Sequence, residues 1–322
     1  MKFLICRLIK VGVLMAACNT AVAQQTVEFN SLSSQDGFAA IYRGEAQYTD
    51  KINGVFTRPS GVVGDVPVMV IMHSSAGVSE ASTGTWSKHF LEMGIATFVV
   101  DSFTPRGLKS SWADQSVLTD AGSAADALKA LEAVSKIPGV DSKRIGVIGF
   151  SRGGIAALHT SLKRVNNTVM GRNSPLKFTL HIAFYPACVR YGTPNGQPTL
   201  IVLGEKDPNH SVASCQRYVD VLKERGAKDV SLVVYPGAYH GFDFDHKDYY
   251  NPKIVHHNNC KTREEDLDNL SYFVDGVKVL AKDYLDYSKS CSSYGMQVGY
   301  NRTAAKESRA LVADFVRKNF AM

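Results

Sequence analysis

The chain has 322 residues, of which 45% are hydrophobic and 20% are charged. It is long enough for one large domain or two ordinary ones, and this composition excludes a disordered or fibrous protein. Lysine and arginine number 36 against 30 acidic residues, but three of the basic residues (Lys2, Arg7 and Lys10) precede residue 24, which leaves 33 against 30. Such a small excess gives no basic surface for binding a nucleic acid.

Residues 1–23 have the layout of a secretory signal peptide. The basic residues are followed by an apolar stretch at 11–17, and the tripeptide Ala-Val-Ala at 21–23 is a small-x-small cleavage motif. The stretch is too short to span a bilayer. A bacterial lipobox ending at Cys18 is the alternative, in which a lipid anchors the protein. We therefore expect an exported protein, periplasmic or secreted, with a mature chain of residues 24–322.

Export affects how the cysteines are interpreted. The mature chain keeps Cys188, Cys215, Cys260 and Cys291. Four cysteines in an oxidising compartment predict two disulfides, for which three connectivities exist. We favour Cys188–Cys215 and Cys260–Cys291, because each pair closes a local loop of about thirty residues. The alternatives are free buried thiols or, less favoured, a metal site, since His256, His257 and Cys260 lack the paired spacing of zinc ligands.

The mature chain alternates between predicted strands and helices. Short polar strands between Gly37 and Arg58 are expected to form an antiparallel edge. Six apolar runs then predict buried strands, at 68–72, 95–100, 144–150, 178–185, 199–203 and 230–235. Helical patterns lie between them, including one at 124–134, and the last helix is expected at 304–316. This order predicts an α/β fold with a mainly parallel central sheet and helices on both faces.

One segment, from about residue 245 to 300, differs from the rest because it is polar and rich in tyrosine. Thr262 and Glu265 fit a capping box, and apolar residues between Leu267 and Leu285 predict a helix after it. We interpret the segment as an insertion before the C-terminal helix, forming a cap or a side wall of a single domain at 24–322.

A candidate nucleophile directly follows the third apolar run. Gly149-Phe-Ser151-Arg-Gly153 matches G-x-S-x-G between a predicted strand and a predicted helix, which is the context of a nucleophile elbow. The glycines are needed because a Cβ at the sharp turn would collide with neighbouring backbone. The turn presents the Ser151 hydroxyl at a helix N-terminus, where the helix dipole favours developing negative charge. A structural turn is the alternative.

A serine hydroxyl needs a base, and His240 is the best candidate among nine histidines. It follows the sixth predicted strand, so it lies at the same edge of the sheet as Ser151. His181 falls inside a strand and is predicted to be a core residue. The base in turn needs an acid to fix its tautomer, and Asp207, after the fifth strand, is favoured over the nearby Glu205.

The oxyanion of a tetrahedral intermediate requires two hydrogen-bond donors. We expect the backbone N–H groups of Arg152, which follows the nucleophile, and of Ser75, in the loop after the first buried strand. His73 in the same loop is interpreted as a structural or orienting residue. The order Ser151, Asp207, His240 is the order of an α/β-hydrolase triad.

These motifs together resemble the dienelactone hydrolase family of α/β-hydrolases. The matching stretches are 72–77, 101–107, 140–154, 203–207 and 235–243. The resemblance implies the α/β-hydrolase fold, ester hydrolysis without a cofactor, and the Ser151–Asp207–His240 triad.

The chain departs from the founding enzymes of this family in two ways. Those enzymes use a cysteine nucleophile, where this chain has Ser151, and they carry an arginine shortly after the catalytic histidine, where this chain has residues 241–243, Gly-Phe-Asp. Both departures argue against dienelactone itself as the substrate and fit an exported branch with a serine nucleophile.

Arg106, after the second buried strand, resembles the family's other substrate-side arginine. That implies a role in binding an acidic or carbonyl group of the substrate. The alternative is a structural salt bridge that holds the turn at 104–107.

The sequence thus predicts a serine hydrolase that cleaves a small-molecule carboxylic ester or lactone through an acyl-enzyme. A peptidase of the same fold is the runner-up. A non-catalytic binding protein is the third possibility, although such proteins usually lack a triad member and all three are present here. We expect no metal, no nucleic acid and no membrane span.

Overall fold

The computed structural model describes residues 24–257 and 259–322, so the predicted signal peptide at 1–23 lies outside the described residues. The centre of the fold is an eight-stranded sheet in the order β1-β2-β4-β3-β5-β6-β8-β9. Its strands are β1 (Gln24–Ser31), β2 (Asp50–Thr57), β3 (Val66–Met72), β4 (Ala96–Asp101), β5 (Val140–Phe150), β6 (His181–Phe184), β8 (Thr199–Gly204) and β9 (Val230–Tyr235). The strands β3, β4, β5, β6, β8 and β9 run parallel, while β2 pairs antiparallel with both of its neighbours, β1 and β4.

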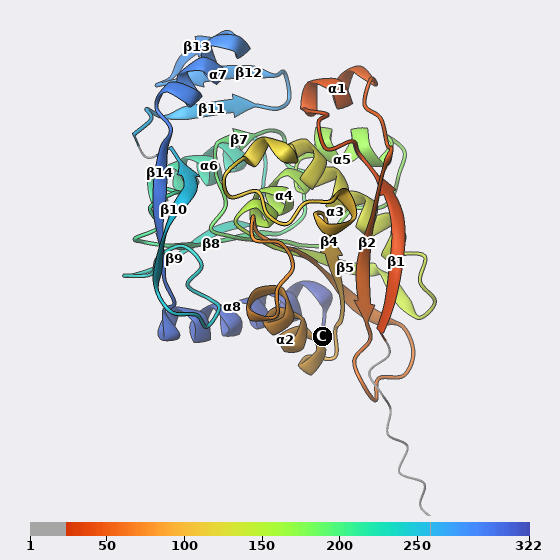
Figure 1. Ribbon diagram of the computed structural model, residues 1–322. Helices are drawn as coiled ribbons and strands as arrows, with labels where there is room; N and C mark the ends of the chain where they lie inside the picture. Colours follow the sequence, from red (N-terminus) through yellow and green to blue (C-terminus); the bar gives the residue numbers. More distant parts are fainter. Residues whose placement is uncertain (1–23, 258) are drawn as a thin grey trace, which may run out of the picture.

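Helices cover both faces of this sheet. The helices of the described chain are α1 (Phe38–Arg43), α2 (Thr85–Glu92), α3 (Asp120–Val134), α4 (Arg152–Thr160), α5 (Lys163–Met170), α6 (Val212–Glu224), α7 (Ala281–Ser290) and α8 (Arg302–Phe320), with short turns η1 (Glu80–Gly84), η2 (Thr104–Arg106) and η3 (Gln115–Val117). Of these, α7 belongs to the segment at 245–300 and not to the layers on the sheet. Figure 1 shows α2 and α8 on one face and α3 and α4 on the other. All residues of β3 and β8 are buried, which explains their unbroken apolar sequences. The predicted α/β fold class is confirmed.

The edge before β3 differs in part from the prediction of short strands. β2 is such a strand and pairs antiparallel with β4, but Phe38–Arg43 is the helix α1, so the prediction was wrong there. Phe38 and Ile41 are buried one helical turn apart, and Gly44, with φ 73°, ends the helix. A helix of six residues is too short to show a clear period in the sequence.

The insertion at residues 245–300 consists mainly of short strands. β10 (Tyr249–His256) pairs with β14 (Ser293–Val298), while β11 (Arg263–Asp266), β12 (Ser271–Val274) and β13 (Val277–Val279) form a meander. The meander joins the rest of the chain because β11 pairs with β7 (Arg190–Tyr191). Figure 1 shows these elements stacked beside one end of the central sheet.

The helix predicted between Thr262 and Leu285 was therefore wrong, except for its last residues in α7. The reason is local turn chemistry. Asp275 and Gly276 both have positive φ, 54° and 77°, the conformation of a type I′ hairpin turn. The Asp-Gly pair was thus a hairpin signal, and it outweighs the approximate helical spacing of the apolar residues around it.

Both predicted disulfides are present. Cys188, after β6, is bonded to Cys215 of α6, and Cys260 is bonded to Cys291 at the end of α7. The first joins the loop after β6 to the flanking helix α6, and the second joins two parts of the insertion. Cys260 is therefore occupied, and no cluster of metal-ligating side chains occurs at 24–257 or 259–322.

The disulfides give a first testable prediction. Protein isolated from an oxidising compartment should show no change in intact mass after alkylation without reduction, and four alkylations after reduction under denaturing conditions. This follows because alkylation requires a thiolate, and all four sulfur atoms are held in disulfides. Alkylation of all four cysteines without reduction would contradict it.

In the part of the chain that the structure describes, no helix has both the length and the apolar character required to cross a membrane.

Candidate active site

The predicted site residues lie at one edge of the sheet. Ser151 follows β5, Asp207 follows β8 and His240 follows β9. Because these strands are parallel, their carboxyl ends meet at the same edge, where open α/β sheets bind their ligands.

Ser151 occupies a strained turn between β5 and α4. Its backbone has φ 53° and ψ −113°, a region that a residue with a side chain rarely adopts and that marks functional strain. A Cβ at Gly149 would overlap the carbonyl of Gly153, and a Cβ at Gly153 would overlap that of Met72. The two glycines of the motif are thus required by close backbone contacts, as the sequence indicated.

His240 and Asp207 form a hydrogen-bonded pair. The distance from His240 Nδ1 to Asp207 Oδ2 is 2.7 Å, and the Asp207 side chain is fully buried. The other oxygen, Asp207 Oδ1, accepts the backbone N–H groups of Asn209 and His210 at 2.8 and 3.1 Å. Burial opposes ionisation of Asp207, but the charge and hydrogen bond of His240 outweigh it and lower its pKa. An ionised Asp207 holds the proton on Nδ1 and leaves Nε2 as the basic atom.

Glu205, the rival acid, has a different partner. Its Oε2 accepts the backbone N–H of Gly237 at 2.9 Å, and its side chain is exposed. It supports the turn after β9, whereas the carboxylate bonded to His240 is that of Asp207.

Ser151 and His240 line one small pocket of about 90 Å³, together with Ser75 and Tyr185. Ser151, Ser75 and Arg152 also line a larger neighbouring pocket of about 610 Å³. The structure therefore brings together the predicted nucleophile, the predicted base and the two residues predicted to supply oxyanion donors.

Gln115 connects the two residues predicted to bind the oxyanion. Its side-chain oxygen accepts Arg152 Nη2 at 2.5 Å and Ser75 Oγ at 3.2 Å. Arg152 also donates to the backbone carbonyls of Gln115 and Leu118 at 2.7 and 2.6 Å. The Arg152 side chain thus fixes the loop around η3, while its backbone N–H at the start of α4 stays the predicted oxyanion donor.

Two other histidines, His73 and His181, are buried within the protein. His73 is buried; its Nε2 accepts the backbone N–H of Ser102 at 3.1 Å and its Nδ1 lies 2.7 Å from the carbonyl of Ser74. His181 is buried inside β6, where desolvation lowers its pKa to about 3 and keeps it neutral. Both positions agree with the structural interpretation of these residues.

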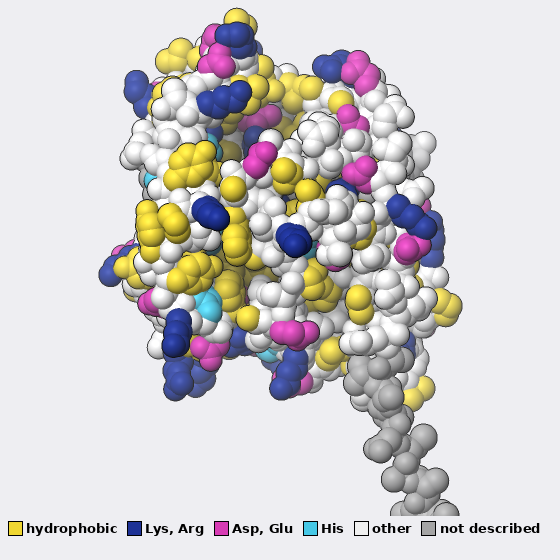
Figure 2. Space-filling model, viewed as in Figure 1, with side chains coloured by type: hydrophobic (Ala, Val, Ile, Leu, Met, Phe, Trp, Pro, Cys, Tyr) yellow, Lys and Arg dark blue, Asp and Glu magenta, His cyan; other side chains and the backbone are white. Residues whose placement is uncertain are grey.

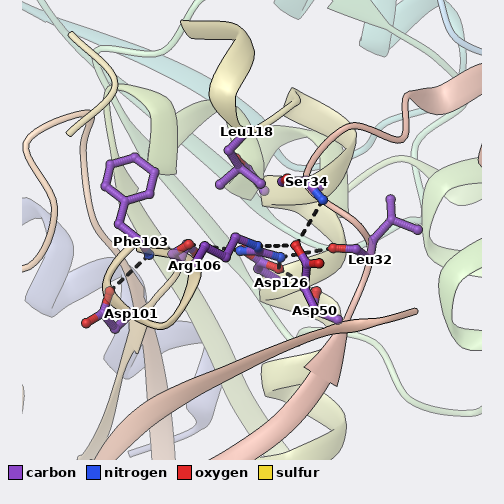
Figure 3. Close-up of polar contacts among 12 residues, drawn as sticks. Leu32, Ser34, Asp50, Asp101, Phe103, Arg106, Leu118 and Asp126 are labelled. Atoms are coloured by element: carbon purple, nitrogen blue, oxygen red, sulfur yellow. Dashed lines mark hydrogen bonds and ion pairs between the residues drawn. The ribbon is translucent and has the colours of Figure 1, made fainter. Parts of the chain in front are cut away.

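Arg106 lies in a buried ion-pair network (Figure 3). Its Nε donates to Asp50 at 2.5 Å, and its two terminal nitrogens donate to Asp126 at 2.7 and 2.9 Å. The remaining donors bond the carbonyls of Ser102 and Leu32 at 2.9 and 3.0 Å. All five N–H groups are used within the protein, which corrects the expectation of a substrate-binding Arg106 in favour of the structural alternative.

Arg106→Ala should accordingly lower the free energy of unfolding by about 3–5 kcal/mol, because it leaves Asp126 buried and without its cation. Asp126 is fully buried in this pair. Urea denaturation measures the loss, and KM for any substrate that is turned over should stay near the wild-type value. Unchanged stability with a strongly raised KM would instead support a substrate role.

Sequence reasoning missed a buried polar network beneath His240. The Tyr185 ring lies 4.5 Å from the His240 ring, centroid to centroid. Its hydroxyl donates to Asp243 Oδ1 at 2.7 Å, and Trp86 Nε1 donates to Asp243 Oδ2 at 2.7 Å. Burial raises the pKa of Asp243, while these two hydrogen bonds oppose the rise. Tyr185 directly follows β6 at the active edge, and this position was the signal that could have identified it.

The insertion also contributes to the site in ways that the sequence did not specify. It supplies part of the wall of the larger pocket through Val255, His257, Arg263, Glu265, Leu270, Tyr272, Tyr284 and Leu285. Arg190, from β7, lies in the same wall and is paired with Asp120 and Glu265, each at 2.5 Å. Residues of the insertion and Ser151 therefore line the same pocket.

Comparison with known proteins agrees with this architecture. The model of the dienelactone hydrolase family matches residues 52–265, more than half of the chain. No curated protein is significantly similar to the sequence.

Three solved structures resemble more than nine tenths of the chain in fold. A candidate dienelactone hydrolase of Klebsiella pneumoniae has a TM-score of 0.54 at 17% identity, covering 93% of this chain and 99% of its own. A dienelactone hydrolase-like promiscuous phosphotriesterase from metagenomic libraries has 0.53 at 14%, covering 92% and 98%. An α/β hydrolase enzyme from a Medee basin deep-sea metagenome library also has 0.53 at 14%, covering 91% and 100%. At these identities the likeness concerns the fold.

Proposed function

The chain belongs to the dienelactone hydrolase family, and from this membership we propose that it is a serine hydrolase that cleaves a carboxylic ester, lactones included. The observation that carries the proposal is the 2.7 Å hydrogen bond between Asp207 and His240, in a site where His240 shares a pocket with the strained Ser151. A strained nucleophile turn, a base and an acid that orients the base are the parts of a catalytic triad.

The acylation step uses all three side chains. His240 Nε2 takes the Ser151 hydroxyl proton as Oγ bonds to the ester carbon, and the carbonyl electrons move to its oxygen. The resulting oxyanion accepts hydrogen bonds from the backbone N–H groups of Arg152 and Ser75. The carbonyl then reforms, the bond to the alcohol oxygen breaks, and the imidazolium of His240 donates its proton to that oxygen.

Deacylation repeats the same proton transfers with water. His240 accepts a proton from the water that attacks the acyl carbon, and then returns it to Ser151 Oγ as the acid leaves. Asp207 stays ionised throughout and stabilises the imidazolium.

We also propose that the protein works outside the cytoplasm. Its two disulfides fit an oxidising compartment, and residues 1–23 have the signal-peptide pattern. The intact mass of the exported protein should match a chain that starts at Gln24, as glutamine or pyroglutamate, and a lipid-modified N-terminus at Cys18 would contradict cleavage at this site.

The activity is tested by pH-stat titration of acid release from ethyl acetate, a series of methyl esters, a δ-lactone and a blocked dipeptide. The proposal expects hydrolysis of esters with no added cofactor. Cleavage of the peptide without cleavage of the esters would favour a peptidase, and the absence of any turnover together with reversible binding would favour a binding protein.

A further inference from the structure

Two pockets of unequal size meet at Ser151. The large pocket has a volume of about 610 Å³ and the small pocket about 90 Å³. They share four lining residues, Ser75, Gln115, Ser151 and Asn209. We propose that the large pocket binds the acyl part of the ester and the small pocket binds its alcohol part, so that the preferred substrates are esters of bulky acids with small alcohols. This inference rests on the proposed serine hydrolase function.

The position of His240 sets the direction of the substrate. His240 lines the small pocket, while the large pocket extends from Ser151 past Arg152 toward the insertion. The alcohol oxygen must receive its proton from His240 when the ester bond breaks. The alcohol therefore lies on the histidine side of Ser151, in the small pocket, and the acyl chain extends the opposite way.

Strand β10 separates the two pockets. Ile254 lines the small pocket and its neighbour Val255 lines the large one, at an irregularity of the β10–β14 pairing between Asn251 and Val255. Ile254 packs with Met296 and Val298 of β14 and with Trp112 in a small apolar cluster. Figure 2 shows hydrophobic side chains gathered over β10 and β14. The insertion thus contributes part of the wall of both binding spaces.

The volumes limit what each pocket accepts. A cavity of about 150 Å³ is known to hold one benzene molecule, so a space of 90 Å³ suits an alcohol of only a few heavy atoms. The large pocket is within the range for small-molecule sites, and Leu270, Tyr272 and Leu285 add apolar and aromatic surface to it. An aromatic or branched acyl group therefore fits there and is excluded from the small pocket.

The test compares two isomeric esters that differ only in which side is bulky. Methyl 3-phenylpropanoate places the phenyl group on the acid, and 2-phenylethyl acetate places it on the alcohol. We expect kcat/KM to favour methyl 3-phenylpropanoate by about tenfold or more, since even one misplaced methylene costs about that much in a shaped pocket. Equal values, or preference for 2-phenylethyl acetate, would overturn the assignment.

Substitutions at two neighbouring residues of β10 should each lower the ratio of kcat/KM for methyl 3-phenylpropanoate to kcat/KM for 2-phenylethyl acetate. Ile254→Ala enlarges the small pocket and should raise kcat/KM for 2-phenylethyl acetate, whereas Val255→Phe fills the large pocket and should lower it for methyl 3-phenylpropanoate. Val277→Ala is the matched control: Val277 is 65% exposed on β13 and lies outside both pockets, so the ratio should not change. If all three variants kept the wild-type ratio, the proposal that β10 separates the two pockets would be contradicted.

Ethyl acetate separates failure of this inference from failure of the proposed function. It is small on both sides, so a serine hydrolase with either orientation should hydrolyse it. Turnover of ethyl acetate with a preference for 2-phenylethyl acetate overturns only the pocket assignment. No turnover of any ester, with no covalent labelling of Ser151 by a fluorophosphonate, overturns the assignment together with the function on which it rests.

Discussion

Replacing Ser151 with alanine is expected to lower kcat for ester hydrolysis by about a millionfold, the size of effect that loss of a serine nucleophile has in a triad enzyme. Alanine has no oxygen to form the acyl-enzyme, so only binding and the oxyanion donors can still act on the substrate. The fold should persist, because the turn is determined by the close packing around Gly149 and Gly153. Initial rates over a range of ester concentrations measure kcat, and circular dichroism checks the fold.

Ser161→Ala is the matched control for this substitution. Ser161 is the residue after α4, at the end opposite to Ser151, and its hydroxyl donates to the Leu158 carbonyl at 2.7 Å. The change removes the same atom from the same helix away from both pockets, so kcat should stay near the wild-type value. A Ser151→Ala protein with wild-type activity would show that the hydrolysis does not use this serine.

Asp207→Asn is expected to lower kcat by about ten-thousandfold. The asparagine would present an N–H₂ group or a neutral oxygen to His240 Nδ1, so it neither enforces the reactive tautomer nor stabilises the imidazolium. Its oxygen can still accept the backbone N–H groups of Asn209 and His210, so the loop after β8 should keep its shape. The measurement is kcat, with circular dichroism to check that the fold is retained.

Glu205→Gln separates the two candidate acids. Glu205 bonds Gly237 and is exposed, so the substitution should reduce kcat little. If Glu205→Gln abolished activity and Asp207→Asn preserved it, the acid assignment would be reversed.

The effect of pH on stability also follows from the Asp207–His240 pair. The pKa of Asp207 lies below its ordinary value, so its stabilising contribution is present above the pKa of an unfolded aspartate. This contribution is lost only as the pH falls through the lowered pKa of the folded state. Thermal unfolding measured at pH values above the pKa of an unfolded aspartate should accordingly show no loss of stability from Asp207.

The central sheet and the placement of Ser151, Asp207 and His240 at one edge of it were predictable because their signals are local. The strands β3 and β8 and the second half of β5, residues 145–150, are buried on both faces and read as continuous apolar runs. Ser151, Asp207 and His240 each follow a strand directly, so the parallel topology alone places them at one edge.

The missed contacts depend on residues far apart in the sequence. Arg106 bonds Asp50, 56 residues away, and Tyr185 bonds Asp243, 58 residues away. Nothing near Arg106 in the sequence shows that two carboxylates will occupy its guanidinium. In the insertion the error had a different origin, since the turn at Asp275 and Gly276 was a local signal that a periodic pattern concealed.

The measurement that tests the account most directly is intact-mass analysis after treatment with a fluorophosphonate probe, followed by peptide mapping. The probe phosphonylates an activated serine, so the wild-type protein should gain one adduct, located on Ser151, and Ser151→Ala should gain none. No adduct on the wild-type protein, or equal labelling of wild type and Ser151→Ala, would contradict the claim that Ser151 is the nucleophile.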